Sequence, residues 1–508
     1  MKKFEQMQNY LKNSFEKPSL VTMVLTSISF YILMFIGYFT QAVFPRKICG
    51  RYNRQGYPEL YDRFTHFFSR YVHRRMGDCW EYPICSSPGA ELVFKERITE
   101  DNGWTFKFTG RKRKCINLGS YNYLGFSDKS GYCTEMAIKA LHTYGISTGA
   151  TRERYGNNEI NNELEKLTAE FVGTEDAVAL GMGFATNSLN IPALVSGGCL
   201  IISDEKNHAS IVLGAQVSGA TVRVFRHNDL EDLEDKLKAA VYYGQPIKEN
   251  NNNHVPWRKI CIIVEGIYSM DASIVPLPEI IALKKRYKAY LYLDEAHSIG
   301  ALGPSGKGVV EYFGCNARDV DLLMGTYAKS FGSAGGYIAG SKELISLLRQ
   351  TCSATKYASS MSPPVAAQVI AVLQILLGKD GTNLAKNRLK TLAINTQYVR
   401  RRLAQTGVII YGHQDAPVVP ILLYRYSKIA STVRALIQRN VAVPAVGYPV
   451  TPILESRMRL CISATHTKEQ LDYALAAIEE VSDEMGLKHL RLPRHLKPVV
   501  YEDIAINL

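Results

Sequence analysis

The sequence lacks the cysteine patterns that mark metal sites and disulfide-stabilised folds. Its ten cysteines are scattered singly through 508 residues, with no C-x-x-C pair and no histidine or cysteine at zinc-ligand spacing. The pattern therefore predicts no metal site and no disulfide framework. It favours a reducing compartment around the globular part of the chain.

The sequence also lacks a basic stripe interleaved with aromatic residues, and it contains no tandem repeat. Nucleic acid is therefore a disfavoured partner, despite a net charge of +13 from 60 Lys and Arg against 47 Asp and Glu. That excess favours other anionic partners, such as phosphate groups, a nucleotide-bearing thioester or a membrane surface.

Charged side chains are missing from Leu20 to Phe44, a run of about 25 residues that is long enough to cross a bilayer as a helix. The length argues against a buried core helix and a signal peptide, and no A-x-A-like cleavage site follows. A helix lying in the membrane interface stays open, because Thr and Ser residues dilute the apolarity. We expect a membrane anchor. A slight excess of basic residues after the segment places the body in the cytosol.

Apolar residues between Tyr57 and Tyr71 recur at helical spacing, with arginines elsewhere on the same helix. Such a helix suits lipid headgroups, a partner subunit or ordinary packing against the main domain.

Short β-rich runs alternate with helical patterns through the main body, which predicts an α/β fold with a mostly parallel sheet wrapped by helices. A further short strand is expected at residues 104–108, and a polar loop insertion at 245–257. After about Pro364 the pattern indicates a smaller α+β domain. The strand runs that carry this prediction are 177–180, 199–203, 259–264, 289–293, 418–423 and 458–462.

Polar side chains follow four of the predicted buried strands, at the edge of a sheet where ligands bind. The four segments are Ser203 to Ser210, Glu265 to Asp271, Asp294 to His297, and the loop containing Lys329. Taken alone, Asp294 fits a helix cap, His208 an ordinary histidine and Lys329 a solvated loop lysine.

Lys329 lies three residues after Thr326 and is bracketed by glycines, which allow close approach of a bulky ligand. Together with His208 and the Asp-x-x-His pair formed by Asp294 and His297, it matches what pyridoxal phosphate needs. Lys329 is the candidate Schiff-base lysine.

The remaining roles follow from the chemistry of the cofactor. A buried carboxylate, Asp294, keeps its pyridine nitrogen protonated. The ring of His208 stacks on the pyridine, and His297 or Ser269 donates to the ring oxygen. Backbone N–H groups at a helix start, from Gly183 and Phe184, together with Thr326, bind the phosphate.

Five long motifs extend this pattern: residues 181–188, 264–270, 291–304, 325–340 and 456–467. From Asn117 to about Thr467 the chain resembles the α-oxoamine synthases, fold-type I pyridoxal-phosphate enzymes that join an amino acid to an acyl-CoA with loss of carbon dioxide. Within this family it is most similar to the catalytic, lysine-bearing subunits of eukaryotic serine palmitoyltransferases, which also carry an N-terminal membrane segment.

The resemblance implies condensation of L-serine with palmitoyl-CoA to 3-oxosphinganine. It makes Lys329, Asp294, His208 and His297 the catalytic residues, with Arg459, or otherwise Arg457, holding the substrate carboxylate. It further implies a heterodimer with a homologous subunit that lacks the lysine, and an endoplasmic reticulum membrane location. Val450 and the segment Thr148 to Tyr155 differ from the usual family sequence. These differences leave open which acyl-chain length and which amino acid the enzyme prefers.

Two alternatives are kept: a related condensing enzyme that uses glycine or alanine, and a non-catalytic membrane scaffold. The predicted organisation is a polar N-terminus, a membrane helix, an arm with an amphipathic helix, a large cofactor-binding domain, a small C-terminal domain and a tail. The corresponding ranges are 1–19, 20–44, 45–116, 117–375, 376–485 and 486–508.

Overall fold

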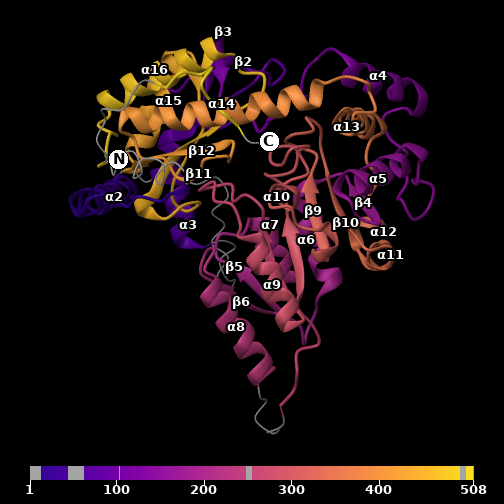
Figure 1. The fold of residues 1–508 in the computed structure, drawn as a ribbon. Coiled ribbons are helices and arrows are strands. Elements are labelled where there is room, and N and C mark those ends of the chain that lie inside the picture. Colours follow the sequence, from indigo (N-terminus) through magenta and orange to yellow (C-terminus); the bar gives the residue numbers. More distant parts are fainter. Residues whose placement is uncertain (1–12, 44–61, 102, 247–253, 492–498, 507–508) are drawn as a thin grey trace.

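A computed structural model describes residues 13–43, 62–101, 103–246, 254–491 and 499–506. The chain forms a large lobe around one central sheet and a second lobe that contains the C-terminal strands, with the long helix α14 lying across the top of the view (Figure 1).

The central sheet has seven strands, in the order β4-β10-β9-β8-β7-β5-β6. Strand β10 is antiparallel to both of its neighbours, and the other strands run in a common direction. This confirms the mostly parallel sheet, although β6, β9 and β10 are not among the predicted strands. The strands are β4 (Asp176–Leu180), β5 (Leu200–Asp204), β6 (Thr221–Phe225), β7 (Ile260–Glu265), β8 (Tyr290–Asp294), β9 (Leu322–Thr326) and β10 (Gly336–Gly340).

Helices cover both faces of this sheet, which explains why its central strands are apolar throughout rather than alternating. On one face Ile191, Ile211 and Ile345 pack against strand residues such as Ile201 and Ile263. The helices of that face are α6 (Gly183–Leu194), α7 (Ala209–Val217), α11 (Lys342–Thr351) and the short α12 (Ser353–Tyr357). The opposite core includes residues of α4 (Tyr132–Tyr144), α5 (Glu159–Val172), α8 (Leu230–Tyr243), α9 (Leu277–Tyr287), α10 (Val309–Tyr312) and α13 (Pro363–Leu376).

The smaller α+β unit expected after Pro364 is present. Its sheet has the order β12-β15-β14, with β12 (Val418–Tyr424), β14 (Ala445–Val446) and β15 (Ser456–Cys461). Its helices are α14 (Leu384–Thr406), α15 (Lys428–Gln438), the single turn η4 (Ile453–Glu455) and α16 (Lys468–Glu484).

An N-terminal hairpin joins this second lobe. Strands β2 (Glu91–Ile98) and β3 (Lys107–Asn117) pair with each other, and β3 pairs in parallel with β13 (Val441–Ala442). The strand predicted at residues 104–108 therefore begins only at Lys107. This pairing ties the hairpin to the second lobe, while the domain boundaries themselves stay a prediction.

The apolar N-terminal run forms helix α2 (Leu20–Val43). This helix is long enough and apolar enough to cross a membrane. The next helical segment comprises α3 (Arg63–Phe67), a π-helical turn η1 (Phe68–Val72) and a 3₁₀ stretch η2 (His73–Cys79). Its apolar face packs against α2 and the second lobe, so ordinary packing, one of the three expected roles of this helix, is present. Residues 57–61 of the predicted helix lie outside the described residues.

Two short elements complete the fold. Strand β1 (Asn13–Ser14) pairs with β11 (Gly412–His413), and η3 (Ala317–Asp319) precedes β9. The predicted loop insertion lies between α8 and β7, where residues 247–253 are outside the described part of the chain.

Candidate active site

The carboxyl ends of the central strands bring the predicted polar residues together, as expected for a parallel sheet. Glu265 at the end of β7 is the direct neighbour of Asp294 at the end of β8. Thr326 ends the adjacent strand β9, three residues before Lys329. These side chains form the wall of the candidate site.

Lys329 is partly buried in the loop between β9 and β10. Its Nζ atom lies 5.8 Å from the centre of the Tyr121 ring. Burial lowers the pKa of Lys329 from 10.5 to about 8, and the Asp294 and Glu265 carboxylates oppose part of that shift. A fully solvated loop lysine, the ordinary alternative, is therefore excluded.

Asp294 is buried, with 3% of its surface exposed. Its Oδ2 atom accepts a hydrogen bond from Asn187 Nδ2 at 2.7 Å, and its Oδ1 atom accepts from the Ala296 N–H at 2.8 Å. Asn187 is oriented in turn by the Tyr292 hydroxyl, which donates to its Oδ1 atom. The carboxylate of Asp294 thus has a fixed direction.

His208 begins helix α7 and faces Phe184, with the two ring centres 6.0 Å apart. Its Nδ1 atom lies 2.7 Å from Ser210 Oγ, and its backbone N–H donates to Glu265 Oε1. Partial desolvation lowers the pKa of His208. Burial together with the Asp294 charge raises the pKa of Glu265 well above its usual value.

His297, three residues after Asp294, is buried, with 5% of its surface exposed. Its Nδ1 atom lies 2.8 Å from the Tyr123 hydroxyl, and its ring meets the edge of Tyr121. Burial and the nearby Lys329 lower the pKa of His297 well below 6.5, so the imidazole is neutral. With Tyr123 at Nδ1, no hydrogen bond uses the Nε2 atom within the part of the chain that the structure describes.

Helix α6 starts directly after β4 at Gly183, and its N-cap residue Met182 supplies no side-chain hydrogen bond. A Cβ atom at Gly183 would lie 2.8 Å from Thr326 Oγ1, so glycine is needed here. The first N–H groups of α6 form a positively polarised helix start. The Thr326 hydroxyl beside it donates to the Gly335 carbonyl at 2.9 Å.

Arg457 and Arg459 lie on the same face of β15, and both are buried. Arg457 pairs with the Glu455 carboxylate at 2.5 Å and donates to the Met270 carbonyl at 2.8 Å. Arg459 has no carboxylate partner among the described residues, and its buried Nε atom has no hydrogen-bond acceptor. It contacts the Tyr121 hydroxyl and, at 3.3 Å, the Ser269 carbonyl.

A family model for aminotransferase class I and II matches residues 113–478. The chain is 47% identical over 502 residues to serine palmitoyltransferase 3 of Homo sapiens, covering 97% of this chain and 90% of that protein. It is 46% identical over 472 residues to serine palmitoyltransferase 2 of Caenorhabditis elegans, and the match covers 92% of this chain and 84% of that protein. The chain belongs to the serine palmitoyltransferase family.

A solved structure of serine palmitoyltransferase from S. paucimobilis, with bound PLP–myriocin aldimine, has a TM-score of 0.72 and 26% identity to this family member. The superposition covers 84% of this chain and 100% of the chain in that structure. The fold-type I architecture is thereby confirmed.

The side chains of this serine palmitoyltransferase relative fit pyridoxal 5'-phosphate. The start of α6 has no side-chain cap, and Gly183 lets it pack closely beside Thr326 Oγ1, so its first N–H groups and that hydroxyl suit a phosphate. Asp294 offers a buried carboxylate for a protonated ring nitrogen. The partly buried Lys329 amine, with its pKa of about 8, suits an aldehyde carbon.

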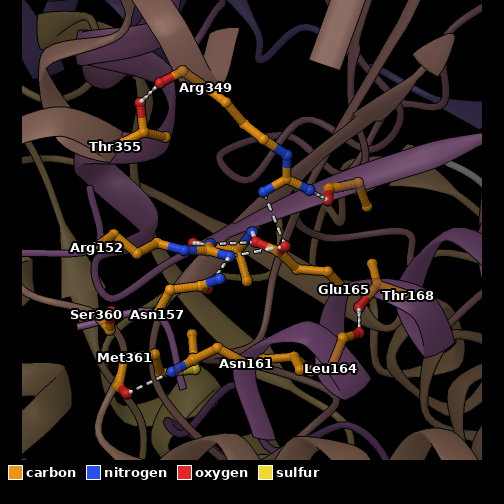
Figure 2. Close-up of polar contacts among 12 residues, drawn as sticks. Arg152, Asn157, Asn161, Leu164, Glu165, Thr168, Arg349, Thr355, Ser360 and Met361 are labelled. Carbon is orange, nitrogen blue, oxygen red and sulfur yellow. Dashed lines mark hydrogen bonds and ion pairs between the residues drawn. The ribbon is translucent and has the colours of Figure 1, made fainter. Parts of the chain in front are cut away.

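A buried ion cluster holds the loop at residues 148–155, whose sequence differs from the usual serine palmitoyltransferase sequence. Arg152 and Arg349 approach the buried Glu165 carboxylate from different elements (Figure 2). The Ala179 N–H donates to the same carboxylate at 2.7 Å. The cluster ties the loop to α5, β4 and α11, next to the start of α6.

Four residues at the site were given no role from the sequence: Tyr121, Tyr123, Asn187 and Glu265. Tyr121 and Tyr123 belong to the segment that opens the large domain, but an aromatic residue in an apolar run is typical of a core. Asn187 lies one turn after Gly183 in a helix, where it is hidden among small residues. Glu265, the last residue of β7, opens one of the four polar segments expected at the sheet edge, and that position was its only signal.

Proposed function

We propose that this chain catalyses the pyridoxal-phosphate-dependent condensation of L-serine with palmitoyl-CoA, giving 3-oxosphinganine, carbon dioxide and free CoA. The observation that carries the proposal is the grouping of a lysine of lowered pKa, a buried aspartate and a buried arginine with no carboxylate partner among the described residues. The product is the first intermediate of sphingolipid synthesis.

Pyridoxal phosphate, when bound, supplies an electron sink for the electron pair that forms at Cα of the amino acid. Lys329 would bind it covalently, Asp294 would pair with its protonated ring nitrogen, and His208 would stack on the ring. The neutral His297 would donate to the ring oxygen through Nε2, with Ser269 as a further candidate. The N–H groups of Gly183 and Phe184, with Thr326, would hold the phosphate.

Lys329 also acts as the base that removes the Cα proton of serine. A base must be unprotonated, and burial provides this by holding the pKa of Lys329 at about 8, near the working pH. The charges of Asp294 and Glu265 keep that pKa from falling further.

Arg459 holds the serine carboxylate. Its guanidinium is fixed by the Ser269 carbonyl and the Tyr121 hydroxyl, which leaves the buried Nε atom without an acceptor. Arg457 is the lesser candidate, because Glu455 already neutralises it. A bound carboxylate satisfies Arg459 with charge-assisted hydrogen bonds.

A partner subunit completes the site. Four large apolar residues near the start of α6 are exposed: Tyr155 at 94%, Met182 at 60%, Phe184 at 39% and Tyr357 at 73%. The Thr151–Ser359 bridge joins the loop that contains Tyr155 to the segment that follows Tyr357, the last residue of α12. Exposed apolar surface of this kind is typical of a protein interface. The partner is a homologous subunit that lacks the lysine.

The acyl-CoA arrives from a membrane. Helix α2 supplies apolar surface for an endoplasmic reticulum membrane, with the catalytic body on the cytosolic side. The net positive charge favours the phosphates of CoA.

Product analysis of the purified complex tests this function. Serine, glycine and alanine are each supplied with a panel of acyl-CoAs, and products are identified by mass spectrometry. We expect 3-oxosphinganine from serine and palmitoyl-CoA, and no product from Lys329→Ala. Preference for glycine or alanine would establish the related condensing enzyme, and absence of turnover with every pair would favour the scaffold.

A further inference from the structure

The polarity of helix α2 is inverted relative to a helix on the surface of a soluble protein. Its six polar residues, Thr22, Thr26, Ser27, Ser29, Thr40 and Gln41, are buried or half-buried. Its exposed positions are all apolar or aromatic: Leu20, Val21, Val24, Leu25, Ile28, Tyr31, Ile32, Phe35, Ile36, Tyr38, Phe39, Ala42 and Val43. The outward face therefore suits hydrocarbon rather than water.

The inward face of α2 is docked on the protein along its length. The Phe30 ring lies 6.1 Å from Tyr426 and 5.7 Å from Tyr448 in the second lobe. A Cβ atom at Gly37 would lie 2.9 Å from the Phe67 ring, so glycine permits this close approach. Ser29 Oγ lies 3.3 Å from Ser427 Oγ.

The chain on both sides of α2 is also fixed to the same body. Before the helix, β1 pairs with β11, and Phe15 lies 5.3 Å from Tyr411 in the second lobe. After the helix, Phe67 of α3 stacks on Tyr38 with ring centres 3.8 Å apart. Figure 1 shows α2 at the edge of the second lobe, beside α3.

We propose that α2 lies flat in the interface of a phospholipid bilayer, with its two ends on the same side of the membrane as the catalytic body. A helix of 24 residues is long enough to span, so length does not decide the matter. The packing of α2 on the second lobe and α3 decides between the two orientations. A helix that crosses the bilayer would either lose these contacts or carry the contacting residues into the hydrocarbon core of the membrane.

The neighbours of α2 are unsuited to hydrocarbon. Arg75 donates to Thr40 Oγ1 at 3.1 Å, and the Asp78–Arg434 ion pair joins η2 to α15. Charged groups are costly inside a bilayer but are at home among headgroups. An interfacial helix also places the second lobe against the lipid from which the proposed acyl substrate comes.

Cross-linking in intact membranes tests the docking. We expect a disulfide in the Ser29→Cys/Ser427→Cys double variant of the full complex, mapped by peptide mass spectrometry. The matched control is Ile28→Cys/Ser427→Cys, whose first cysteine is on the exposed face and which should not cross-link. Absence of the first disulfide in a variant that retains its fold by cofactor absorbance would overturn the proposal.

A topology measurement tests the same proposal without relying on either variant. An N-glycosylation acceptor and an epitope are fused ahead of Met1, and the complex is placed in sealed microsomes. We expect no glycan, and protease digestion of the epitope without detergent. A glycan or a protected epitope would show that α2 crosses the bilayer. Product formation in the same microsomes would then leave the proposed reaction standing.

Discussion

The Lys329 amine combines a lowered pKa with two nearby carboxylates, so its protonation sets when it reacts. A neutral amine is required to attack an aldehyde, and the neutral fraction rises as the pH passes about 8 rather than 10.5. We expect the rate of pyridoxal phosphate attachment to the apoprotein to rise about tenfold per pH unit below this value and to level off above it. Stopped-flow absorbance measures this rate; a continued rise to pH 10 would contradict the assigned burial.

Arg459 and Arg457 form a natural comparison, because they share a strand face and differ in their partners. Arg459→Ala should raise KM for serine roughly 10- to 150-fold, which corresponds to a charged hydrogen bond of about 1.5–3 kcal/mol. Cofactor absorbance should be unchanged.

Arg457→Ala is the control, since it removes the partner of Glu455 and affects stability more than KM. Steady-state kinetics and thermal unfolding of both variants distinguish the roles. Equal KM values for Arg459→Ala and the unchanged protein would exclude Arg459 as the carboxylate ligand.

The placement of Lys329, Asp294, His208 and His297 was predictable from sequence because each follows an apolar strand or belongs to a motif of distinctive polar residues. Tyr121 was not predictable in the same way. Its hydroxyl meets Arg459 and its ring meets Lys329 only after the two lobes pack together. Contacts of this long range leave no trace in local spacing.

At the scale of elements, the buried Glu165 cluster connects the loop at residues 148–155 to α5, β4 and α11. Glu165 is bound by Arg152 and Arg349, whose side chains are 12% and 32% exposed. Glu165→Gln leaves two cations without their anion and should lower the free energy of unfolding by about 3–5 kcal/mol. Thermal unfolding measures the loss.

The matched control is Glu100→Gln, which breaks an ion pair whose two side chains are 68% and 67% exposed. It should change the free energy of unfolding by less than about 1 kcal/mol. Equal effects of the two variants would show that the Glu165 cluster contributes no more than a surface pair.

Strand prediction succeeded at β7 and β8, which are apolar runs bounded by polar residues, but it missed β9 and β10. It failed at β6, whose sequence alternates around Arg223 at the edge of the sheet. The strand expected from Trp104 failed for another reason: Arg74 lies over the Trp104 ring, so this tryptophan packs on η2 instead of joining a ladder.

For the whole molecule, the exposed apolar residues beside α6 predict where the proposed partner subunit binds. Tyr155→Glu should reduce recovery of the partner in affinity purification, because it puts a charge into an apolar contact. Tyr242→Glu is the control. Tyr242 is also exposed, at 75%, but it lies on α8, which is not part of the proposed interface beside α6. Unchanged recovery with Tyr155→Glu would remove this surface from the interface.

The fold class was predictable from the alternation of strands and helices, and the second lobe from the change of pattern after Pro364. The docking of α2 was not, because composition reports only that a helix is apolar. Which of its faces meets protein depends on Phe67, Tyr426 and Tyr448, which lie far from one another in sequence.

The attachment point of the cofactor tests the account most directly. The complex is loaded with pyridoxal phosphate, reduced with borohydride and digested, and the modified peptide is sequenced by mass spectrometry. The account predicts one phosphopyridoxyl group, on Lys329, and none in the Lys329→Ala variant. Modification at another lysine, or a peptide containing Lys329 that stays unmodified while the complex forms 3-oxosphinganine, would contradict it.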